Sequence, residues 1–302
     1  MGTMRGCRFG FLLLVYFGIG SCQFQQQSAQ RDAQSLDFIT IGTFNIEWLG
    51  DGINDRKPRT EEDLRRLGEL IQRSGVDLLG VQEVENDRAL RRLLRYLPDF
   101  EGIVGSLGGQ QNLGLLYRRS VQVRSLGEYT PLMVQPGRTR PGLLAYCRAG
   151  NADFYLMVVH LKSTSRYDDT PELQELSRQL RLRQAQRLSQ WVDSLLARSR
   201  ERDIVIVGDF NDTPRRRKYP TLTPLLENPA LVFLTAELRS CRYERAYVID
   251  HVVVSSSFWQ RFRSGSAHVV NFYAQYPFSE AERLSDHCPV VAQFDVTQPD
   301  ND

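Results

Sequence analysis

The stretch IVIVGDFNDTP, residues 204–214, decides how this chain of 302 residues folds. Its β-branched residues predict a strand that is buried on both faces, as in the middle of a layered α/β protein. Directly after this run come the carboxylate of Asp209 and the carboxamide of Asn211. Such oxygens suit a hard divalent cation, so the end of this strand is a candidate site for a metal ion and a phosphate ester.

Other apolar runs along the chain also end on a polar residue that suits a metal ion or a phosphate. The run at 38–45 ends on Asn45, that at 77–83 on Glu83, that at 155–160 on His160, and that at 247–250 on Asp250. The pair Asp286 and His287 stands just before a further apolar run. A single Asn, Asp or His after a strand is usually a turn former, a helix cap or a core residue. The repeated pattern instead predicts one cleft into which several buried strands open.

A set of motifs follows in order along the chain: FNIEW (44–48), VQEVEN (81–86), GLLYRR (114–119), VVHLKS (158–163), GDFNDTP (208–214), YVIDHVVVS (247–255) and LSDHCPV (284–290). This ordered set resembles the endonuclease/exonuclease/phosphatase family. GDFN followed by SDH is specific for the family, whereas GLLYRR alone is not. The resemblance runs from about Phe38 to Phe294. It implies an α/β fold like that of deoxyribonuclease I, a four-layered α/β sandwich of two packed mixed β-sheets flanked by helices.

The spacing of the candidate residues favours one domain for most of the chain. They extend from Asn45 to His287, so both ends of the chain must converge. Strand-like runs alternate with helical runs at 61–74, 87–97 and 172–200, which is typical of layered α/β architecture. We expect one family domain over 37–297 and a tail over 298–302. Polar loops at 50–60, 125–142 and 163–171 are expected to rim the cleft.

The first residues predict export. Arg5 and Arg8 precede a short apolar run at 9–20, which is typical of a signal peptide and too short for a comfortable membrane span. The run ends IGSC (19–22), which is similar to the lipobox of bacterial lipoproteins. We therefore expect a signal peptide over 1–21, a lipid on Cys22 that anchors an exported bacterial protein to the membrane of the cell envelope, and a tether over 22–36. The alternative is cleavage further on, which would release a soluble periplasmic or secreted protein.

Charge gives no general attraction to nucleic acid. The predicted signal peptide contains two of the 38 basic residues and none of the 36 acidic ones, so the mature chain is close to neutral. Local basic residues remain candidates for binding phosphate: Arg215 and Arg216 directly after GDFNDTP, and Lys162 two residues after His160. Arg181, in contrast, is expected on the solvent-facing side of a helix.

Three cysteines follow Cys22, and they show no zinc spacing and no CxxC motif. They are Cys147, Cys241 and Cys288. One disulfide is permitted in an exported protein, but the sequence does not select the pair. Because Cys288 begins an apolar run, we expect it to be a buried packing thiol rather than a nucleophile.

The resemblance also implies roles for the candidate residues. The residues implied as metal ligands are Asn45, Glu83 and Asp286, for Mg²⁺ or else Mn²⁺ or Ca²⁺. The residues implied in catalysis are His160, Asp209, Asn211, Asp250 and His287. Among these, Asp209 and Asn211 would orient and activate water, and His287, held by Asp250, would bind or protonate a phosphoryl oxygen.

One stretch departs from the family pattern. Deoxyribonuclease-like members carry a Glu that supports the histidine, whereas the corresponding stretch of this chain reads GQQNLG at 109–114. A neutral Gln or Asn could orient His160 but would not raise its pKa. His160 is therefore a weak candidate for a general acid.

The sequence favours a monomeric, metal-dependent phosphodiesterase that acts on nucleic acid as an exported endonuclease or exonuclease. The enzymatic alternative is a phosphatase or phosphodiesterase for small or lipid-headgroup phosphoesters. Asp212 and Thr213 disfavour an inositol phosphatase, because those enzymes usually continue the central motif as GD-x-N-Y-R. The other alternative is a non-catalytic surface binding module, which the retention of every polar site disfavours.

Overall fold

The computed structural model describes residues 1–2, 36–165 and 167–300. The chain divides into two units, Met1–Ser35 and Leu36–Asp302, and the following description concerns the second. The predicted lipid site at Cys22, and nearly all of the predicted signal peptide and tether, lie outside the described residues. Within the described part of the chain, no helix is both long and apolar enough to cross a membrane.

Two mixed sheets of six strands form the centre of the second unit. The first sheet has the order β11-β12-β1-β2-β4-β3 and the second the order β5-β6-β7-β8-β10-β9. The strands of the first are β1 (Phe38–Leu49), β2 (Leu78–Val84), β3 (Phe100–Val104), β4 (Asn112–Arg118), β11 (His268–Val269) and β12 (Val290–Asp295). Those of the second are β5 (Gln122–Tyr129), β6 (Gly142–Ala149), β7 (Ala152–His160), β8 (Ile204–Asp209), β9 (Leu231–Phe233) and β10 (Asp250–Ser255).

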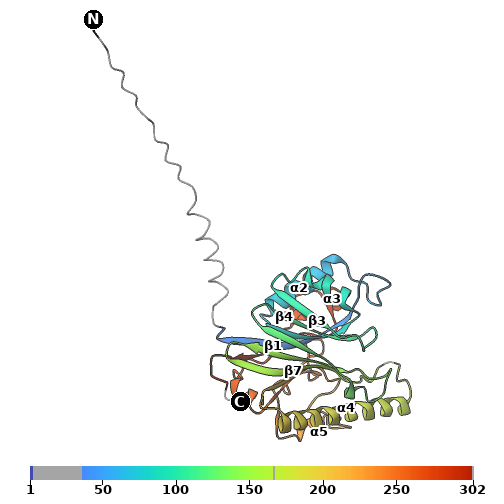
Figure 1. The fold of residues 1–302 in the computed structure, drawn as a ribbon. Coiled ribbons are helices and arrows are strands. Elements are labelled where there is room, and N and C mark those ends of the chain that lie inside the picture. The colour runs from blue at the N-terminus through green and yellow to red at the C-terminus, as the bar shows by residue number, and fades with distance from the viewer. Residues whose placement is uncertain (3–35, 166, 301–302) are drawn as a thin grey trace. The chain divides into compact units, whose positions relative to one another are not determined.

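Helices form the two outer layers (Figure 1). The first sheet is covered by α2 (Glu61–Arg73), α3 (Asp87–Leu94) and α6 (Phe278–Leu284), and the second by α4 (Pro171–Arg198) and α5 (Thr223–Leu226). Short 3₁₀ helices are η1 (Thr130–Leu132), η2 (Phe258–Arg261) and η3 (Phe272–Ala274). The expected four-layered sandwich is confirmed, and the three predicted helices differ from the observed ones only at their ends.

The β8 strand shows why the IVIV run is apolar on both faces. Val205 and Val207 point into the core between the two sheets, whereas Ile204 and Ile206 pack beneath α4. The sheets come very close near Gly80 of β2, where an added Cβ would lie 2.6 Å from the Val207 side chain. Burying both faces of β8 removes its side chains from water and fixes the strand that carries Asp209.

Strand direction brings the candidate residues to one edge of the sandwich. The pair β1–β2 and the pair β7–β8 are each parallel, with Asn45 opposite Gln82 and His160 opposite Asp209. The β10 strand is antiparallel to β8, and Asp250 lies opposite Asp209. The expectation that Asp250 ends a strand is wrong, because Asp250 begins β10. It still reaches the site, since an antiparallel strand begins at the edge where its neighbour ends.

Arg181 does not lie on the solvent-facing side of α4. It is 5% exposed, its Nε donates to Thr221 Oγ1 at 2.8 Å, and its Nη1 donates to the Lys162 carbonyl at 2.5 Å. The segments that follow β7 and β8 fold against the first half of α4 and cover it. Helical periodicity cannot report such coverage, because it depends on loops from elsewhere in the chain.

Candidate active site

Asn45 links carboxylates that belong to different sheets. Its Nδ2 donates to Glu83 Oε1 at 3.4 Å and to Asp209 Oδ2 at 3.1 Å. Its Oδ1, the atom that could bind a cation, accepts a hydrogen bond from the Glu47 backbone at 2.9 Å. Asn45 is therefore placed to hold Glu83 and Asp209 at a fixed separation, and its oxygen is already engaged.

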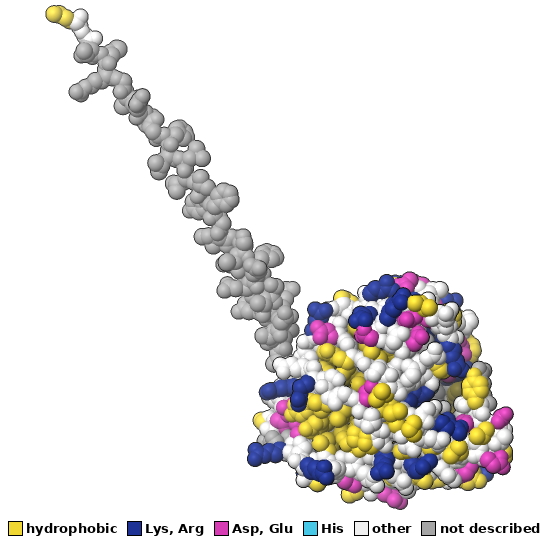
Figure 2. All heavy atoms as spheres, turned by 45° about the vertical axis from the view of Figure 1, so that its right-hand side comes forward, with side chains coloured by type: hydrophobic (Ala, Val, Ile, Leu, Met, Phe, Trp, Pro, Cys, Tyr) yellow, Lys and Arg dark blue, Asp and Glu magenta, His cyan; other side chains and the backbone are white. Residues whose placement is uncertain are grey.

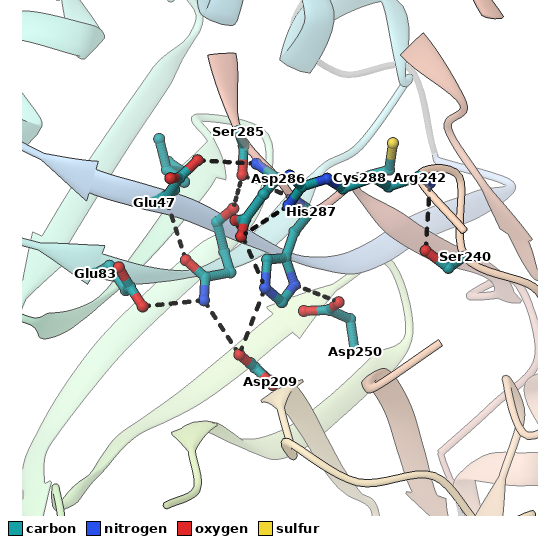
Figure 3. A network of polar contacts seen from close by, with 12 residues as sticks. Glu47, Glu83, Asp209, Ser240, Arg242, Asp250, Ser285, Asp286, His287 and Cys288 are labelled. Atoms are coloured by element: carbon teal, nitrogen blue, oxygen red, sulfur yellow. Dashed lines mark hydrogen bonds and ion pairs between the residues drawn. The ribbon is translucent and has the colours of Figure 1, made fainter. Parts of the chain in front are cut away.

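His287 lies among three carboxylates, with Asp250 and Asp209 close to its ring (Figure 3). Its Nδ1 is 2.7 Å from Asp250 Oδ2, and its Nε2 is 3.9 Å from Asp209 Oδ2 and 3.8 Å from Asp286 Oδ1. Burial by itself lowers the pKa of His287, but Asp250, then Asp209 and Asp286, outweigh it and hold this pKa well above its ordinary value. His287 is thus a cation at neutral pH, with its tautomer and orientation fixed by Asp250.

Asp209 lies at the bottom of the site and is 2% exposed. Burial and the neighbouring Asp250 raise the pKa of Asp209 to about 7, although His287, the Asn211 backbone and Asn45 lower it. The Asn211 N–H donates to Asp209 Oδ1 at 2.8 Å, and Asn211 Nδ2 donates to the Leu161 carbonyl at 3.0 Å. A carboxyl with this pKa can accept or release a proton near neutrality.

His160 faces the same carboxylates but has the opposite protonation state. Its Nε2 is 3.5 Å from Asp209 Oδ2 and 4.0 Å from Glu83 Oε1. Burial lowers the pKa of His160 well below its ordinary value, and the positive charges of Arg140, His287 and Lys162 lower it further. His160 is therefore a neutral hydrogen-bonding group.

The Gln and Asn side chains of the 109–114 stretch do not orient His160. Gln111 accepts a hydrogen bond from Arg140, and Asn112 donates to the carbonyls of Glu85 and Gly109, both at 2.7 Å. Nδ1 of His160 is buried and has no hydrogen-bond partner among the described residues. Its ring is held by packing and by the carboxylates at Nε2.

Two buried carboxylate oxygens in the site have no hydrogen-bond partner within the described ranges: Glu83 Oε2 and Asp250 Oδ1. A buried oxygen without a donor is costly unless a cation meets it, so the donor set fits a divalent metal ion. Glu83 also adopts φ of +64°, a strained backbone conformation of the kind found at functional sites.

Ligand atoms of Asp209, Asp250 and His287 lie within 4.8 Å of one another. Of this group, His287 is unsuited to a metal because its ring is protonated and already bonded to Asp250. Glu83 is the residue that fits a metal ion best, and together with Asp286 it lines a cavity beside the site.

Arg59 and Ser285 organise the site and were missed by the sequence analysis. The buried guanidinium of Arg59 donates to the carbonyls of Ile46 at 2.6 Å, of Glu47 at 2.8 Å, of Trp48 at 2.9 Å and of Leu284 at 2.7 Å. It therefore joins the end of β1 to the segment that precedes His287.

Ser285 Oγ donates to the Asn45 carbonyl at 2.7 Å and accepts from the His287 N–H at 3.0 Å. Each residue is ordinary in sequence, and its role depends on contacts between distant segments.

His251 supports the GDFND turn from β10 and is fully buried. Its Nε2 is 3.1 Å from the Asp212 carbonyl, and its Nδ1 is 2.9 Å from Thr235 Oγ1. Because the carbonyl can only accept, Nε2 carries the proton and Nδ1 accepts from Thr235. Burial lowers the pKa of His251 to about 4, against a smaller opposing effect of Asp212 and Asp250.

Cys288 is not a packing thiol. It forms a disulfide with Cys241, 47 residues earlier in the chain, and the buried Cys147 is the free cysteine of the described part. The prediction failed because the partner lies in the segment between β9 and β10, which the fold brings beside the SDHC motif. The bond anchors the residue that directly follows His287.

The basic run after GDFNDTP does not line the site. Arg216 Nε is 2.6 Å from Asp212 Oδ1, and Arg215 forms an ion pair with Glu237. The proposed phosphate-binding role of Arg215 and Arg216 is therefore not supported, since nearby acidic side chains take up their charge.

A cavity of about 770 Å³ adjoins Glu83 and Asp286 and is lined by basic residues from other segments. These are Arg56, Lys57, Arg138, Arg140 and Lys162. Lys162 was expected near the site, and the three loops expected to rim the cleft all contribute to this lining. The only signal for Arg138 and Arg140 in the sequence is that residues 129–152 contain no acidic residue.

Comparison with solved structures shows the same fold at low sequence identity. Truncated TDP2 of Caenorhabditis elegans superposes with a TM-score of 0.61 and 16% identity, over 85% of this chain and 98% of that one. An endonuclease/exonuclease/phosphatase family protein of Bacteroides thetaiotaomicron gives 0.60 and 15%, over 88% and 98%. A mannosyl-6-phosphatase of the same organism gives 0.58 and 15%, over 84% and 98%.

The sequence comparisons identify the family. Among curated proteins, no match is found. The family model described as "Endonuclease/Exonuclease/phosphatase family" matches residues 42–287, which contain every candidate site residue. This chain therefore belongs to the endonuclease/exonuclease/phosphatase family.

Proposed function

We propose that this protein is a divalent-metal-dependent phosphodiesterase that hydrolyses phosphoester bonds in nucleic acid. Family membership supports phosphoesterase activity. The observation that carries the proposal is the meeting of Asp209, the His287–Asp250 pair and the unpartnered Glu83 Oε2 at one edge of the sandwich. Asp209 is the proton acceptor of this arrangement, His287 is the cation for a phosphoryl oxygen, and Glu83 is a ligand for a metal ion.

Glu83 and Asp286 would hold Mg²⁺, or else Mn²⁺ or Ca²⁺, and the bound ion would offset charge on the phosphoryl and leaving oxygens. Asp209 is placed to take a proton from the attacking water, because its pKa of about 7 suits proton transfer at neutral pH. Asn211, fixed beside Asp209 by its backbone hydrogen bond, would orient that water. His287 would donate from Nε2 to a phosphoryl oxygen while Asp250 keeps it cationic.

His160 contributes to this reaction as a neutral group. Its low pKa excludes it as a proton donor at neutral pH, so it is placed to hydrogen-bond the substrate or the catalytic carboxylates. The two histidines thus have different roles: His287 is a charged group that binds a phosphoryl oxygen, and His160 is a neutral hydrogen-bonding group.

The lining of the adjoining cavity favours a nucleotide substrate. Trp48 and Tyr167 line the same cavity as the basic residues. Aromatic rings beside basic side chains are how proteins commonly bind the bases and phosphates of single-stranded nucleic acid. Basic and acidic side chains are interspersed on the face that Figure 2 presents, and the predicted mature chain is close to neutral, so the proposed affinity for nucleic acid rests on this cavity.

A phosphatase for small phosphoesters is the second candidate. The cavity volume of about 770 Å³ also suits a sugar phosphate, and a protein of similar fold is a mannosyl-6-phosphatase. A phosphomonoester would need the same proton acceptor and the same cationic histidine. The two candidates differ only in what the adjoining cavity binds.

The test is an assay of the purified protein against DNA, RNA and a panel of phosphomonoesters, with Mg²⁺, Mn²⁺ or Ca²⁺ and with excess chelator. We expect cleavage of nucleic acid that the chelator abolishes. Glu83→Gln should weaken Mn²⁺ binding in calorimetry without lowering the melting temperature, because this carboxylate faces the cavity. Full turnover in excess chelator would refute the metal requirement. Hydrolysis confined to phosphomonoesters would select the second candidate.

A further inference from the structure

One wall of the cavity beside Glu83 carries more positive charge than its acidic neighbours offset. We call Arg138, Arg140 and Lys162 the cationic wall. All three line the cavity, Arg138 and Arg140 from the segment between η1 and β6, and Lys162 from the segment after β7. The roles assigned above to the catalytic residues do not use this wall.

Arg140 is a partly buried cation, and no carboxylate of the described residues pairs with it directly. It donates a hydrogen bond to Gln111, but its Nε is buried without a partner, and it makes no ion pair within 4.0 Å across residues 36–165 and 167–300. Burial lowers the pKa of Arg140, while the charges of Glu83 and Asp209 act in the opposite direction. A guanidinium held in this way is prepared for an anion that the protein does not itself supply.

Arg138 and Lys162 share a single carboxylate. Arg138 Nη2 is 3.8 Å from Asp168 Oδ1, and Lys162 Nζ is 3.6 Å from Asp168 Oδ2. Asp168 is 5% exposed and accepts from the Ser165 N–H at 2.8 Å, so it is fixed in place. Asp168 is thus the one carboxylate of the described residues that pairs with the wall within 4.0 Å, whereas Glu83 and Asp209 act on Arg140 from farther away.

The wall is built on ordered backbone. The Lys162 N–H donates to Gln184 Oε1 at 2.8 Å, which ties this segment to α4. On the other segment, Thr139 Oγ1 donates to the Gln135 carbonyl at 2.9 Å and accepts from the Gln135 N–H at 3.0 Å. Little ordering of these loops would remain when an anion binds, which favours binding.

The cavity also has an aromatic side. The guanidinium of Arg56 stacks on the Trp48 ring at 4.0 Å, and Arg56 Nη2 donates to Tyr167 Oη at 2.8 Å. Flat side chains beside a basic wall match a nucleoside with a phosphate attached. A free inorganic anion would use the basic wall alone.

We propose that the cationic wall of Arg138, Arg140 and Lys162 binds a second phosphate of the substrate, the one that flanks the phosphoester being cleaved. The proposal rests on the proposed function and adds a substrate class to it, namely oligonucleotides with at least two phosphates. The second phosphate comes either from the next phosphodiester of the chain or from a terminal phosphomonoester. Both sources present anionic oxygens that Arg forks and Lys bind.

The test compares four probes with the metal-loaded protein: the dinucleotide TpT, its 5′-phosphorylated form, its 3′-phosphorylated form, and the trinucleotide TpTpT. We expect at least one of the last three to be cleaved with kcat/KM about 10- to 100-fold above that of TpT, mainly through a lower KM, because hydrogen bonds to a charged group contribute about 1.5–3 kcal/mol. A preference for TpTpT over both terminally phosphorylated probes would assign the wall to a chain phosphate. The reverse would assign it to a terminal phosphate.

The variants Arg138→Gln and Lys162→Gln test the assignment through the ratio of kcat/KM between the best probe and TpT, measured on one enzyme. This ratio should fall toward one in both variants and recover in part in Arg138→Lys. Arg183→Gln, which removes an exposed arginine of α4, is the matched control and should keep the wild-type ratio. Because each ratio is internal to one enzyme, a general loss of activity does not affect it.

Two outcomes would overturn the proposal. One is a wild-type enzyme that cleaves TpT as efficiently as the probes with two phosphates. The other is a ratio that survives in both glutamine variants, which would place the second phosphate elsewhere. A wild-type enzyme that cleaves neither the four probes nor the DNA and RNA of the earlier assay would instead contradict the proposed function itself.

Discussion

Three histidines of this chain have three different environments, and the environment decides what each can do. His287 is kept cationic by Asp250, whereas His160 is kept neutral by burial and by nearby positive charges. His251 is neutral and fully buried, and it supports the GDFND turn. The same imidazole is thus a charged phosphate ligand, a neutral polar group and a structural hydrogen-bonding group.

Replacing the two strand-end histidines should separate their roles. We expect His287→Ala to lower kcat about 10²- to 10⁴-fold or more, and His160→Ala to lower it about 10²-fold or less, because only His287 is charged and held by a carboxylate. Steady-state kinetics on the preferred substrate measures both losses. Equal losses would contradict the division of roles, and unchanged melting temperatures would show that folding is intact.

His251 should make stability depend on pH. Its pKa of about 4 in the folded protein lies below its ordinary value of about 6.5, so the unfolded chain binds the extra proton more readily. The contribution of neutral His251 to the free energy of unfolding is complete above about pH 6.5 and is lost as the pH falls toward 4. The full loss is about 3 kcal/mol, from about 1.4 kcal/mol per pH unit. Urea unfolding between pH 7 and 4 should show a shallower decline in His251→Gln than in the wild type, and equal declines would refute this.

At the scale of the strands, much of the site could be predicted because a buried strand has a simple sequence signature. The IVIV run and the runs before Asn45, Glu83 and His160 are strands in the structure, and these polar residues meet as expected. The strand predicted to end on Asn45 instead continues to Leu49, past a shift in its pairing with β2. Asp250 was assigned to the wrong end of a strand, because an apolar run does not show at which residue the hydrogen bonding to a neighbouring strand begins.

The basic residues of the site could not be located in this way. Arg215 and Arg216 follow the central motif in sequence, but neighbouring carboxylates pair with them. Arg138 and Arg140 come from the segment between η1 and β6, and their side chains contact Asp168 and Gln111, which belong to other segments. Neighbours in sequence predict the ends of strands well, whereas the charges that line a cavity are set by which loops the fold brings together.

Gly208 couples β8 to β7. A Cβ on Gly208 would lie 2.0 Å from the Val159 carbonyl oxygen, and a backbone atom cannot move aside cheaply. Gly208→Ala should lower the free energy of unfolding by at least about 1–3 kcal/mol and reduce activity, because the shift would displace Asp209 and His160. Denaturant unfolding and kinetics measure the two effects.

Gly102→Ala is the matched control, since its nearest neighbours are the flexible ends of Leu90 and Leu116 at 2.9 and 3.1 Å. It should cost less stability than Gly208→Ala and leave activity unchanged. A Gly208→Ala protein with the stability and activity of the control would show that β7 and β8 tolerate a wider separation.

For the molecule as a whole, the site is completed only when both ends of the domain are in place. Asn45 comes from the first strand, and His287 lies shortly before the last, which begins at Val290. The spacing of the candidate residues predicted this convergence, and the alternation of strand-like and helical runs predicted layered α/β architecture. The four layers themselves were implied by the resemblance to the family. Export and lipid attachment at Cys22 depend on residues 1–22 of the sequence alone and stay predictions.

Because of the disulfide Cys241–Cys288, we expect the stability and turnover of the protein to depend on the compartment in which it is produced. In a reducing cytosol the link would not persist, and the chain would lose the constraint on a loop of 47 residues, about 4 kcal/mol in the chain-entropy description. The residue after His287 would then be a free thiol, and the backbone beside the histidine would lose one of its anchors. We expect protein made in an oxidising compartment to melt higher and turn over faster than the same chain made in the cytosol. An assay that finds no activity in protein produced in the cytosol would therefore concern the chain without its disulfide.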